Sequence, residues 1–165
     1  MSLTAGVIHA DVSEQNVIVQ ERPAAGQTTV ERYTVSGIID WGHSQEAYFV
    51  MDVAIAIMYM MVDSKFMDPL EVGGHLLFGY CQHRPLTDAE FDALKVLVAS
   101  RFCQSLVLGA YSYSKDPGNE YLLLTAKQGW KVLEQLWRTD KAELYSRWRE
   151  TMKEHSWKLQ ETLMQ

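Results

Sequence analysis

The segment HADVSEQN, residues 9–16, and the segment IIDWG, residues 38–42, frame the part of the chain where strand patterns predominate. The first segment leads into a β-branched run at residues 17–19, and the second closes a run rich in valine, isoleucine and tyrosine. β-Branched residues bounded by polar ones favour strands. Residues 21–29 contain proline and glycine, which are typical of a turn. The stretch 17–40 therefore predicts a strand, a hairpin turn and a returning strand or strand pair.

Beyond Gly42 the apolar residues follow the spacing of a helix rather than that of a strand. Five helices are expected, over residues 46–62, 69–83, 87–113, 120–137 and 141–164. The first is apolar on nearly every side and should be central, and Thr87 and Glu90 have capping-box spacing at the start of the third. Three tryptophans at helical positions are expected to pack in the core: Trp130, Trp137 and Trp148. The predicted fold class is α+β, a β-hairpin region packed on about five helices in a single domain, residues 1–165.

The charge of the chain argues against one class of partner. The 165 residues carry a formal net charge of −6, from 15 Lys and Arg against 21 Asp and Glu. A nucleic-acid surface needs the opposite sign, so DNA and RNA are not expected as partners. The acidic excess lies in residues 1–63, which hold 8 acidic and 2 basic residues. This N-terminal third is therefore suited to a bound cation.

The cysteine and hydropathy patterns indicate a reducing, aqueous environment. Cys81 and Cys103 have no metal-ligand spacing and do not make a disulfide framework. The most apolar stretch, residues 47–62, is shorter than the roughly 20 residues of a bilayer span and contains Asp52, so it is interpreted as a core helix. The first residues lack the basic and apolar regions of a signal peptide. We expect a cytoplasmic location and no membrane association.

Three oxygen-bearing side chains stand near the ends of the predicted strands. Asp11 and Asn16 occur in the pattern H-x-D-x-x-x-x-N, and Asp40 follows an apolar run. Phosphoryl transfer needs a carboxylate that accepts the proton of the attacking hydroxyl, and oxygen ligands for the metal ions on the phosphates. Mg²⁺ prefers oxygen ligands and often takes only one or two protein carboxylates. Strand pairing would bring Asn16 and Asp40 together, and Gly42 would let the backbone turn after Asp40.

Other interpretations use the same residues. Asp11, Asn16 and Asp40 are also residue types that commonly form turns or end strands. His9 and Asp11 could begin an iron site, although the helical remainder of the chain suits a dioxygenase barrel poorly. The third ligand of that site would be another histidine: His43, His75 or His83. Cys81 and a nearby histidine resemble half of a zinc site, but no second pair has ligand spacing.

The two segments resemble the catalytic loop and the metal-binding loop of the aminoglycoside phosphotransferase and choline-kinase-like family, which shares the protein-kinase fold. This resemblance implies that Asp11 is the catalytic base and that His9 holds the catalytic loop in shape. It implies Asn16 and Asp40 as ligands of Mg²⁺. The implied donor is GTP or ATP, and the implied acceptor is a small amino acid or amino alcohol.

Residues 48–61 and 100–108 extend the resemblance to the branch of this family that phosphorylates the side-chain hydroxyl of 5-hydroxylysine with GTP. Within them, Asp52 matches an acidic position in the helix after the metal-binding loop and is expected to support the site. Arg101 is costly to bury unpaired. It either pairs with a carboxylate such as Asp52 or binds the substrate's carboxylate through a bidentate contact. The run Met-Tyr-Met-Met, residues 58–61, either fills the core or lines a substrate pocket.

The chain also departs from the family pattern. Ala10 stands where the family usually has glycine, and Trp41 where it commonly has phenylalanine. The resemblance covers residues 6–137, and the family's nucleotide-clamping lobe would precede residue 6. We therefore expect a C-terminal lobe fragment that is inactive by itself.

A second function class remains open at this point. The chain would then be a non-catalytic helical interaction or dimerisation module that retains a relic of the kinase site. Such a module would expose apolar surface where the missing lobe once packed, and would cover it by self-association or with a partner. The sequence does not distinguish GTP from ATP and does not identify the acceptor.

Overall fold

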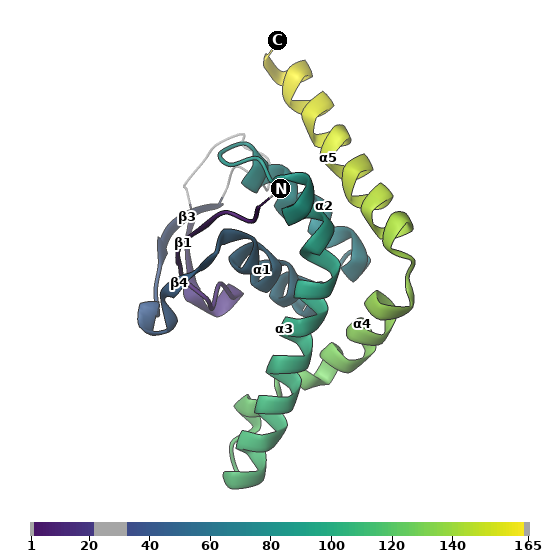
Figure 1. Ribbon diagram of the computed structural model, residues 1–165. Coiled ribbons are helices and arrows are strands. Elements are labelled where there is room, and N and C mark those ends of the chain that lie inside the picture. The colour runs from purple at the N-terminus through teal and green to yellow at the C-terminus, as the bar shows by residue number, and fades with distance from the viewer. Residues whose placement is uncertain (1, 22–32, 164–165) are drawn as a thin grey trace.

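Figure 1 shows the computed structural model, which describes residues 2–21 and 33–163, with side chains as far as residue 156. Helices make up most of these residues, and two short antiparallel sheets lie on one side of them. The expected mixture of helix and sheet is confirmed. Residues 22–29 of the expected turn lie outside the described residues.

The predicted hairpin strands are present. Strand β2, Val17–Glu21, pairs antiparallel with β3, Tyr33–Ile38, and the register places Val17 opposite Ile38. The backbone N–H of Ile39 then donates to the carbonyl of Asn16 at 3.0 Å. The pairing therefore brings the ends of the two diagnostic segments side by side.

A second sheet was not expected. Strand β1, Ala5–Ile8, pairs antiparallel with β4, Gln45–Tyr48, so residues 46–48 are extended rather than helical. Gly6 lies opposite Ala47, and a Cβ on Gly6 would stand 2.2 Å from the ring of Phe49. The pairing of β4 with a strand far away in sequence therefore overrides the helical spacing of its side chains.

The helical part confirms the five expected helices with small shifts at their ends. They are α1, Phe49–Asp63; α2, Val72–Cys81; α3, Asp88–Lys115; α4, Ala126–Arg138; and α5, Lys141–Leu163. Short 3₁₀ turns, η3 at Pro69–Glu71 and η4 at Glu120–Leu123, precede α2 and α4. Helix α1 is central, as predicted, and packs against α2, α3 and the strands (Figure 1).

The core is built mainly on α1, α3 and α5. Its fully buried side chains include Ile57, Met58, Phe102 and Trp148. The indole N–H of Trp148 donates to the carbonyl of Leu70 at 2.7 Å, which anchors α5 beside α2. Burial of these side chains supplies the driving force that holds the helices together.

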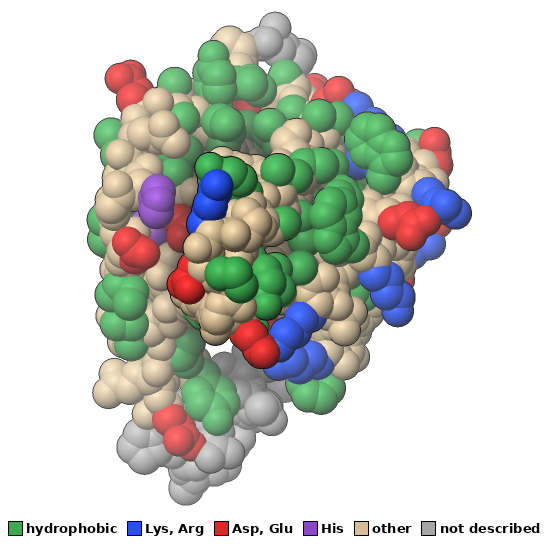
Figure 2. Space-filling view, turned by 90° about the horizontal axis from the view of Figure 1, so that it is seen from below, with side chains coloured by type: hydrophobic (Ala, Val, Ile, Leu, Met, Phe, Trp, Pro, Cys, Tyr) green, Lys and Arg blue, Asp and Glu red, His purple; other side chains and the backbone are tan. Residues whose placement is uncertain are grey.

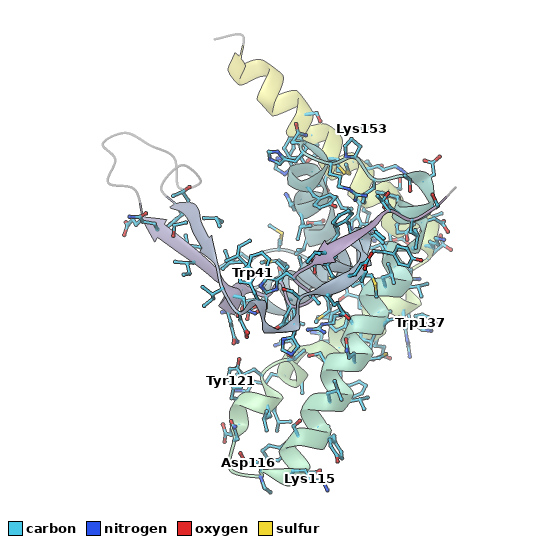
Figure 3. All side chains as sticks on the ribbon, turned by 60° about the vertical axis from the view of Figure 1, so that its left-hand side comes forward. Trp41, Lys115, Asp116, Tyr121, Trp137 and Lys153 are labelled. Carbon is cyan, nitrogen blue, oxygen red and sulfur yellow. The ribbon has the colours of Figure 1, made fainter. Side chains whose placement is uncertain are left out.

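Two of the three tryptophans expected in the core are at the surface. Trp130 is 55% exposed and Trp137 is 65% exposed. Only one face of α4 is buried, through Val132 and Leu136, and both tryptophans project from its other sides. The ammonium group of Lys95 lies 5.9 Å from the ring centre of Trp137, which Figure 3 places at the edge of the helical part.

The start of α3 is held by a buried carboxylate. Thr87 and Glu90 form both hydrogen bonds of the predicted capping box. Glu90 also accepts from the backbone N–H of Thr4 at 3.0 Å and pairs with Arg84 at 3.2 Å, and its side chain is fully buried. Burial by itself favours the neutral acid, but hydrogen bonds from these partners lower the pKa of Glu90 to about 2. Glu90 therefore ties the N-terminal segment to α3.

Helix α3 has an apolar exposed side. By length and composition it could cross a membrane, and 28% of its most apolar window is buried inside the molecule. A single helix of this kind is weak grounds for a membrane span, because core helices have the same character. Its exposed apolar residues are Val96, Val107, Leu108 and Tyr111. Figure 2 shows hydrophobic side chains interspersed with acidic and basic ones on one face of the molecule.

Candidate active site

The loop after β1 is held by Asp52, which lies in the first turn of α1. The two carboxylate oxygens of Asp52 accept the backbone N–H groups of His9 and Ala10, each at 2.7 Å. Ala10 has a φ of 67°, in the left-handed region that favours glycine. The two charge-assisted hydrogen bonds hold the loop in this conformation. Asp52 thus supports the loop, and this contact takes the place of the expected pairing with Arg101.

His9 joins the two diagnostic segments. Its Nε2 lies 2.8 Å from the carbonyl of Ile39, and its Nδ1 accepts the backbone N–H of Asp11 at 3.2 Å. These partners fit the tautomer in which Nε2 donates to the carbonyl of Ile39. The ring is buried and meets Trp41 edge-on, with ring centres 4.7 Å apart. His9 therefore positions the loop and does not face the cleft described below.

The backbone turns sharply at Asp40 and not at Gly42, where the turn was expected. Asp40 has a φ of 63°, whereas Gly42 has no left-handed φ. Aspartate is among the few non-glycine residues that tolerate this conformation, because its short polar side chain bonds locally. The turn precedes the 3₁₀ helix η2, Trp41–His43, and leaves Asp40 exposed.

Asn16 and Asp11 contact each other directly. The amide nitrogen Nδ2 of Asn16 donates to the carbonyl of Asp11 at 2.9 Å and to its carboxylate Oδ2 at 3.2 Å. Because Nδ2 is used in this way, the amide oxygen Oδ1 of Asn16 is the end that can meet a cation. Asn16 ends the short 3₁₀ helix η1, Glu14–Asn16, and is buried.

The three predicted oxygen donors line one cleft. Asp11, Asn16 and Asp40 border a cavity of about 630 Å³ whose opposite wall comes from α1, α3, η4 and α4. The hydroxyl of Tyr121 in η4 donates to Gln15 at 2.5 Å across this space. Figure 3 shows Tyr121 on η4, facing the strand region that carries Trp41. The two segments that are separated in sequence therefore border the same cleft.

Arg101 contacts Asp11 rather than Asp52. Its Nη2 lies 2.6 Å from Oδ1 of Asp11 and also donates to the hydroxyl of Tyr59 at 2.8 Å. That hydroxyl donates in turn to Oδ1 of Asp11 at 3.2 Å. Burial raises the pKa of Tyr59, while Arg101 opposes and Asp11 reinforces the increase, so the phenol stays protonated. The expected carboxylate pairing of Arg101 is present, with a different partner.

The role of Tyr59 was missed in the sequence, where it belonged to a run that either fills the core or lines a pocket. Met58 and Met61 are indeed fully buried in the core, whereas Tyr59 lines the cleft. One signal could have found it. Tyr59 follows Asp52 by two helical turns, so both share one face of α1.

The charges around the cleft favour a cation. The acidic side chains on its wall are Asp11, Glu14, Asp40 and Asp63, against two basic ones, Lys65 and Lys127. The carboxylate of Asp40 and the amide oxygen of Asn16 are ligand types that suit Mg²⁺. Among the described residues, no three His, Cys, Asp or Glu side chains gather as an iron or zinc site would require.

Comparisons with known proteins found relatives that are named as kinases. The chain is 45% identical to a hydroxylysine kinase of Bos taurus over 148 residues, which is 89% of the chain and 38% of that protein. A hydroxylysine kinase of Mus musculus matches with the same identity and coverage. The chain is related to hydroxylysine kinases. A homoserine kinase of Gluconacetobacter diazotrophicus is 32% identical over 115 residues, which is 70% of the chain and 32% of that protein.

The resemblance seen in the two segments is thereby confirmed, and it extends well beyond them. No family model matches the chain. The chain spans about 38% of the length of the hydroxylysine kinases that it matches.

Proposed function

We propose that the chain carries the base and the metal ligands of a small-molecule kinase. The enzyme would transfer the γ-phosphoryl group of GTP or ATP to the side-chain hydroxyl of 5-hydroxylysine or a similar amino acid. The observation that carries this proposal is the convergence of Asp11, Asn16 and Asp40 on one cleft. The names of the relatives support the acceptor class.

The roles of the residues follow from their contacts. Asp11 would accept the proton of the acceptor hydroxyl while the hydroxyl oxygen forms a bond to the γ-phosphorus. The bond between that phosphorus and the bridging oxygen of the nucleotide breaks, and the nucleoside diphosphate leaves. Asn16 and Asp40 would hold Mg²⁺, which, when bound, offsets negative charge on the phosphates. Positioning provides most of the catalysis in this chemistry. His9 and Asp52 would contribute by holding the loop that carries Asp11.

The placement of the chain within the enzyme is part of the same proposal. The 165 residues would form one domain, equivalent to most of the C-terminal lobe of a kinase-like enzyme in the cytoplasm. The nucleotide clamp would come from a lobe outside them, so the isolated chain would not phosphorylate its substrate efficiently. The acidic cleft suits the ammonium groups of an amino-acid acceptor.

The test measures phosphorylation of 5-hydroxylysine, homoserine and choline by the full-length gene product, with GTP and with ATP. We expect Mg²⁺-dependent transfer to one amino-acid acceptor, and loss of activity in EDTA. Asp11→Asn and Asp40→Ala should each lower kcat by roughly 10³-fold, because they remove the base and a metal ligand. Glu134→Gln is the matched control, because Glu134 is a carboxylate on the surface of α4 that pairs with Arg138. A near-normal kcat in either site variant would contradict the assigned roles.

One observation favours a second function, that of an interaction module. Apolar side chains on the strands and in η2 are largely exposed, including Val7 at 71%, Val35 at 61% and Trp41 at 58%. Such a surface is typical of one that is covered in the working protein. Light scattering of the 165-residue chain after size exclusion distinguishes the cases. A dimer would support self-association through this surface, and a monodisperse monomer would count against it.

A further inference from the structure

Asp11 is held from behind by two side chains of the helical core. Both the guanidinium of Arg101 and the hydroxyl of Tyr59 contact the same oxygen, Oδ1. The other oxygen, Oδ2, contacts the amide of Asn16, on the side of the metal ligands. The carboxylate therefore has one end fixed to α1 and α3 and the other end near the Asn16 side of the cleft.

The two side chains also fix each other. Nη2 of Arg101 donates to the Tyr59 hydroxyl, and the guanidinium carbon lies 5.3 Å from the centre of the Tyr59 ring. Nη1 of Arg101 donates to Gln104 at 2.9 Å. The donors run in one direction, from Arg101 to Tyr59 and from Tyr59 to Asp11, because the raised pKa of Tyr59 keeps its proton in place.

The backbone that carries these residues lies in the packed core. Met58 and Phe102, their neighbours in α1 and α3, are fully buried, and these two helices pack closely together. Interiors of this kind resist small shifts, so side chains that they carry are well placed to aim a reactive group.

The arrangement is a poor device for stability. The side chain of Arg101 is only 16% exposed, and its Nε is buried without an acceptor among the described residues. Burying a charged group with an unsatisfied donor costs free energy that a hydrophobic pair would not. The buried position of Arg101 is therefore better explained by its contact with Asp11 at the cleft.

We propose that Tyr59 and Arg101 form a clamp on Oδ1 of Asp11 and are positioning residues for phosphoryl transfer. The clamp sets the rotamer of Asp11 so that Oδ2 meets the acceptor hydroxyl. Neither residue bonds to the substrate. This inference rests on the proposed function, because it takes Asp11 as the base.

The test uses Tyr59→Phe and Arg101→Gln in the full-length gene product, with Tyr145→Phe and Arg149→Lys as matched controls. Tyr145 is also a buried phenol that accepts from Lys95 N–H and donates to the Asp92 carbonyl, away from the cleft. Arg149 lies over the ring of Phe91, at 4.6 Å from its centre. Thermal unfolding of all four variants shows which remain folded.

The clamp predicts a fall in kcat with little change in KM for either substrate. Tyr59→Phe should lower kcat about 10-fold and Arg101→Gln about 100-fold, with KM values within about threefold of wild type. Arg101→Lys should restore part of kcat, because the lysine ammonium group can still donate to Oδ1 of Asp11. The controls should keep kcat.

Other outcomes would overturn the clamp. A 10-fold rise in the acceptor KM at unchanged kcat in Arg101→Gln would assign Arg101 to the carboxylate of the substrate instead. Equal losses of kcat in the clamp and control variants would mean that Tyr59 and Arg101 have only a structural role.

Asp11→Asn separates the two proposals. If it keeps its activity, the proposed function itself fails. If it is inactive while Tyr59→Phe and Arg101→Gln are normal, only the clamp fails. In the Asp11→Asn background, Tyr59→Phe should have no further effect on any residual rate.

Discussion

Two arginine–carboxylate pairs lie on different parts of this molecule, and they are built differently. Glu90 is fully buried, and its oxygens accept two backbone N–H groups as well as Arg84. Asp11 is 23% exposed, and among the described residues its carboxylate oxygens contact the side chains of Arg101, Tyr59 and Asn16 and no backbone N–H. Glu90 is thus committed to the backbone, whereas Asp11 lies at a cleft.

The difference shows how to distinguish a structural ion pair from one that serves a site. Backbone donors are available only where the fold has placed them, so a carboxylate that uses them joins segments and stabilises the fold. A carboxylate held by side chains alone can be aimed, and it keeps a side open to a ligand. Substitutions in the pair of Glu90 with Arg84 should therefore lower stability, whereas substitutions in the pair of Asp11 with Arg101 should lower activity.

The largest expected effect on stability is that of Glu90→Gln. Loss of the charge leaves Arg84 without its carboxylate and weakens the bonds to Thr4 and Thr87. We expect a loss of about 3 kcal/mol, at the low end for a broken buried pair because Arg84 remains 28% exposed. Urea unfolding of the 165-residue chain measures it. Asp11→Asn is the comparison and should cost less, about 1.5 kcal/mol, because its amide oxygen can still accept from Arg101 and Tyr59; equal losses in the two variants would remove the distinction.

Acid should weaken the contacts that Glu90 makes with Thr4, Thr87 and Arg84. The pKa of Glu90 in the folded chain, about 2, lies below its ordinary value of 4.5. The ionised group therefore contributes its full stability above about pH 4.5, and this contribution is lost as the pH falls toward 2. Urea midpoints at pH 7 and pH 3 should show a larger acid-induced drop in wild type than in Glu90→Gln. A variant with an undiminished drop would show that other carboxylates govern the acid response.

Asp52→Asn should affect both stability and the site. An amide is neutral and has one acceptor oxygen, so one of the two N–H groups of His9 and Ala10 loses its acceptor and the other keeps only an uncharged one. We expect a loss of about 2 kcal/mol in urea unfolding and faster amide exchange at Ala10. Asp63→Asn, at the exposed end of the same helix, is the control and should be nearly neutral. Slow exchange at Ala10 in Asp52→Asn would mean that the loop holds its shape without this carboxylate.

The smallest effect is expected for Ala10→Gly. A left-handed φ costs alanine about 1 kcal/mol relative to glycine, and the greater freedom of glycine in the unfolded chain offsets part of this gain. The variant should therefore be more stable by about 0.5 kcal/mol. Ala110→Gly, within the regular helix α3, should instead lose about 1 kcal/mol. A destabilised Ala10→Gly would show that Ala10 is not strained.

Much of the fold and of the candidate site could be predicted from local signals. The hairpin strands, the five helices, the capping box at Thr87 and the convergence of Asp11, Asn16 and Asp40 all follow from residue type and spacing. The strand β4 could not be predicted, because its residues have helical spacing and only the distant β1 pairs with them. The exposure of Trp130 was likewise not visible in sequence, since it depends on which face of α4 meets α3.

The sequence by itself determined the chemistry of this protein: which oxygen donors it has, how far apart they stand along the chain, and which helices would be apolar enough to pack. The tertiary structure decided the partners. Arg101 pairs with Asp11 instead of Asp52, and Asp52 accepts the backbone N–H of Ala10 in the loop. The physical reason is that donors and acceptors pair by distance and direction in space. Those are fixed by how α1 and α3 pack, and no spacing within one helix encodes them.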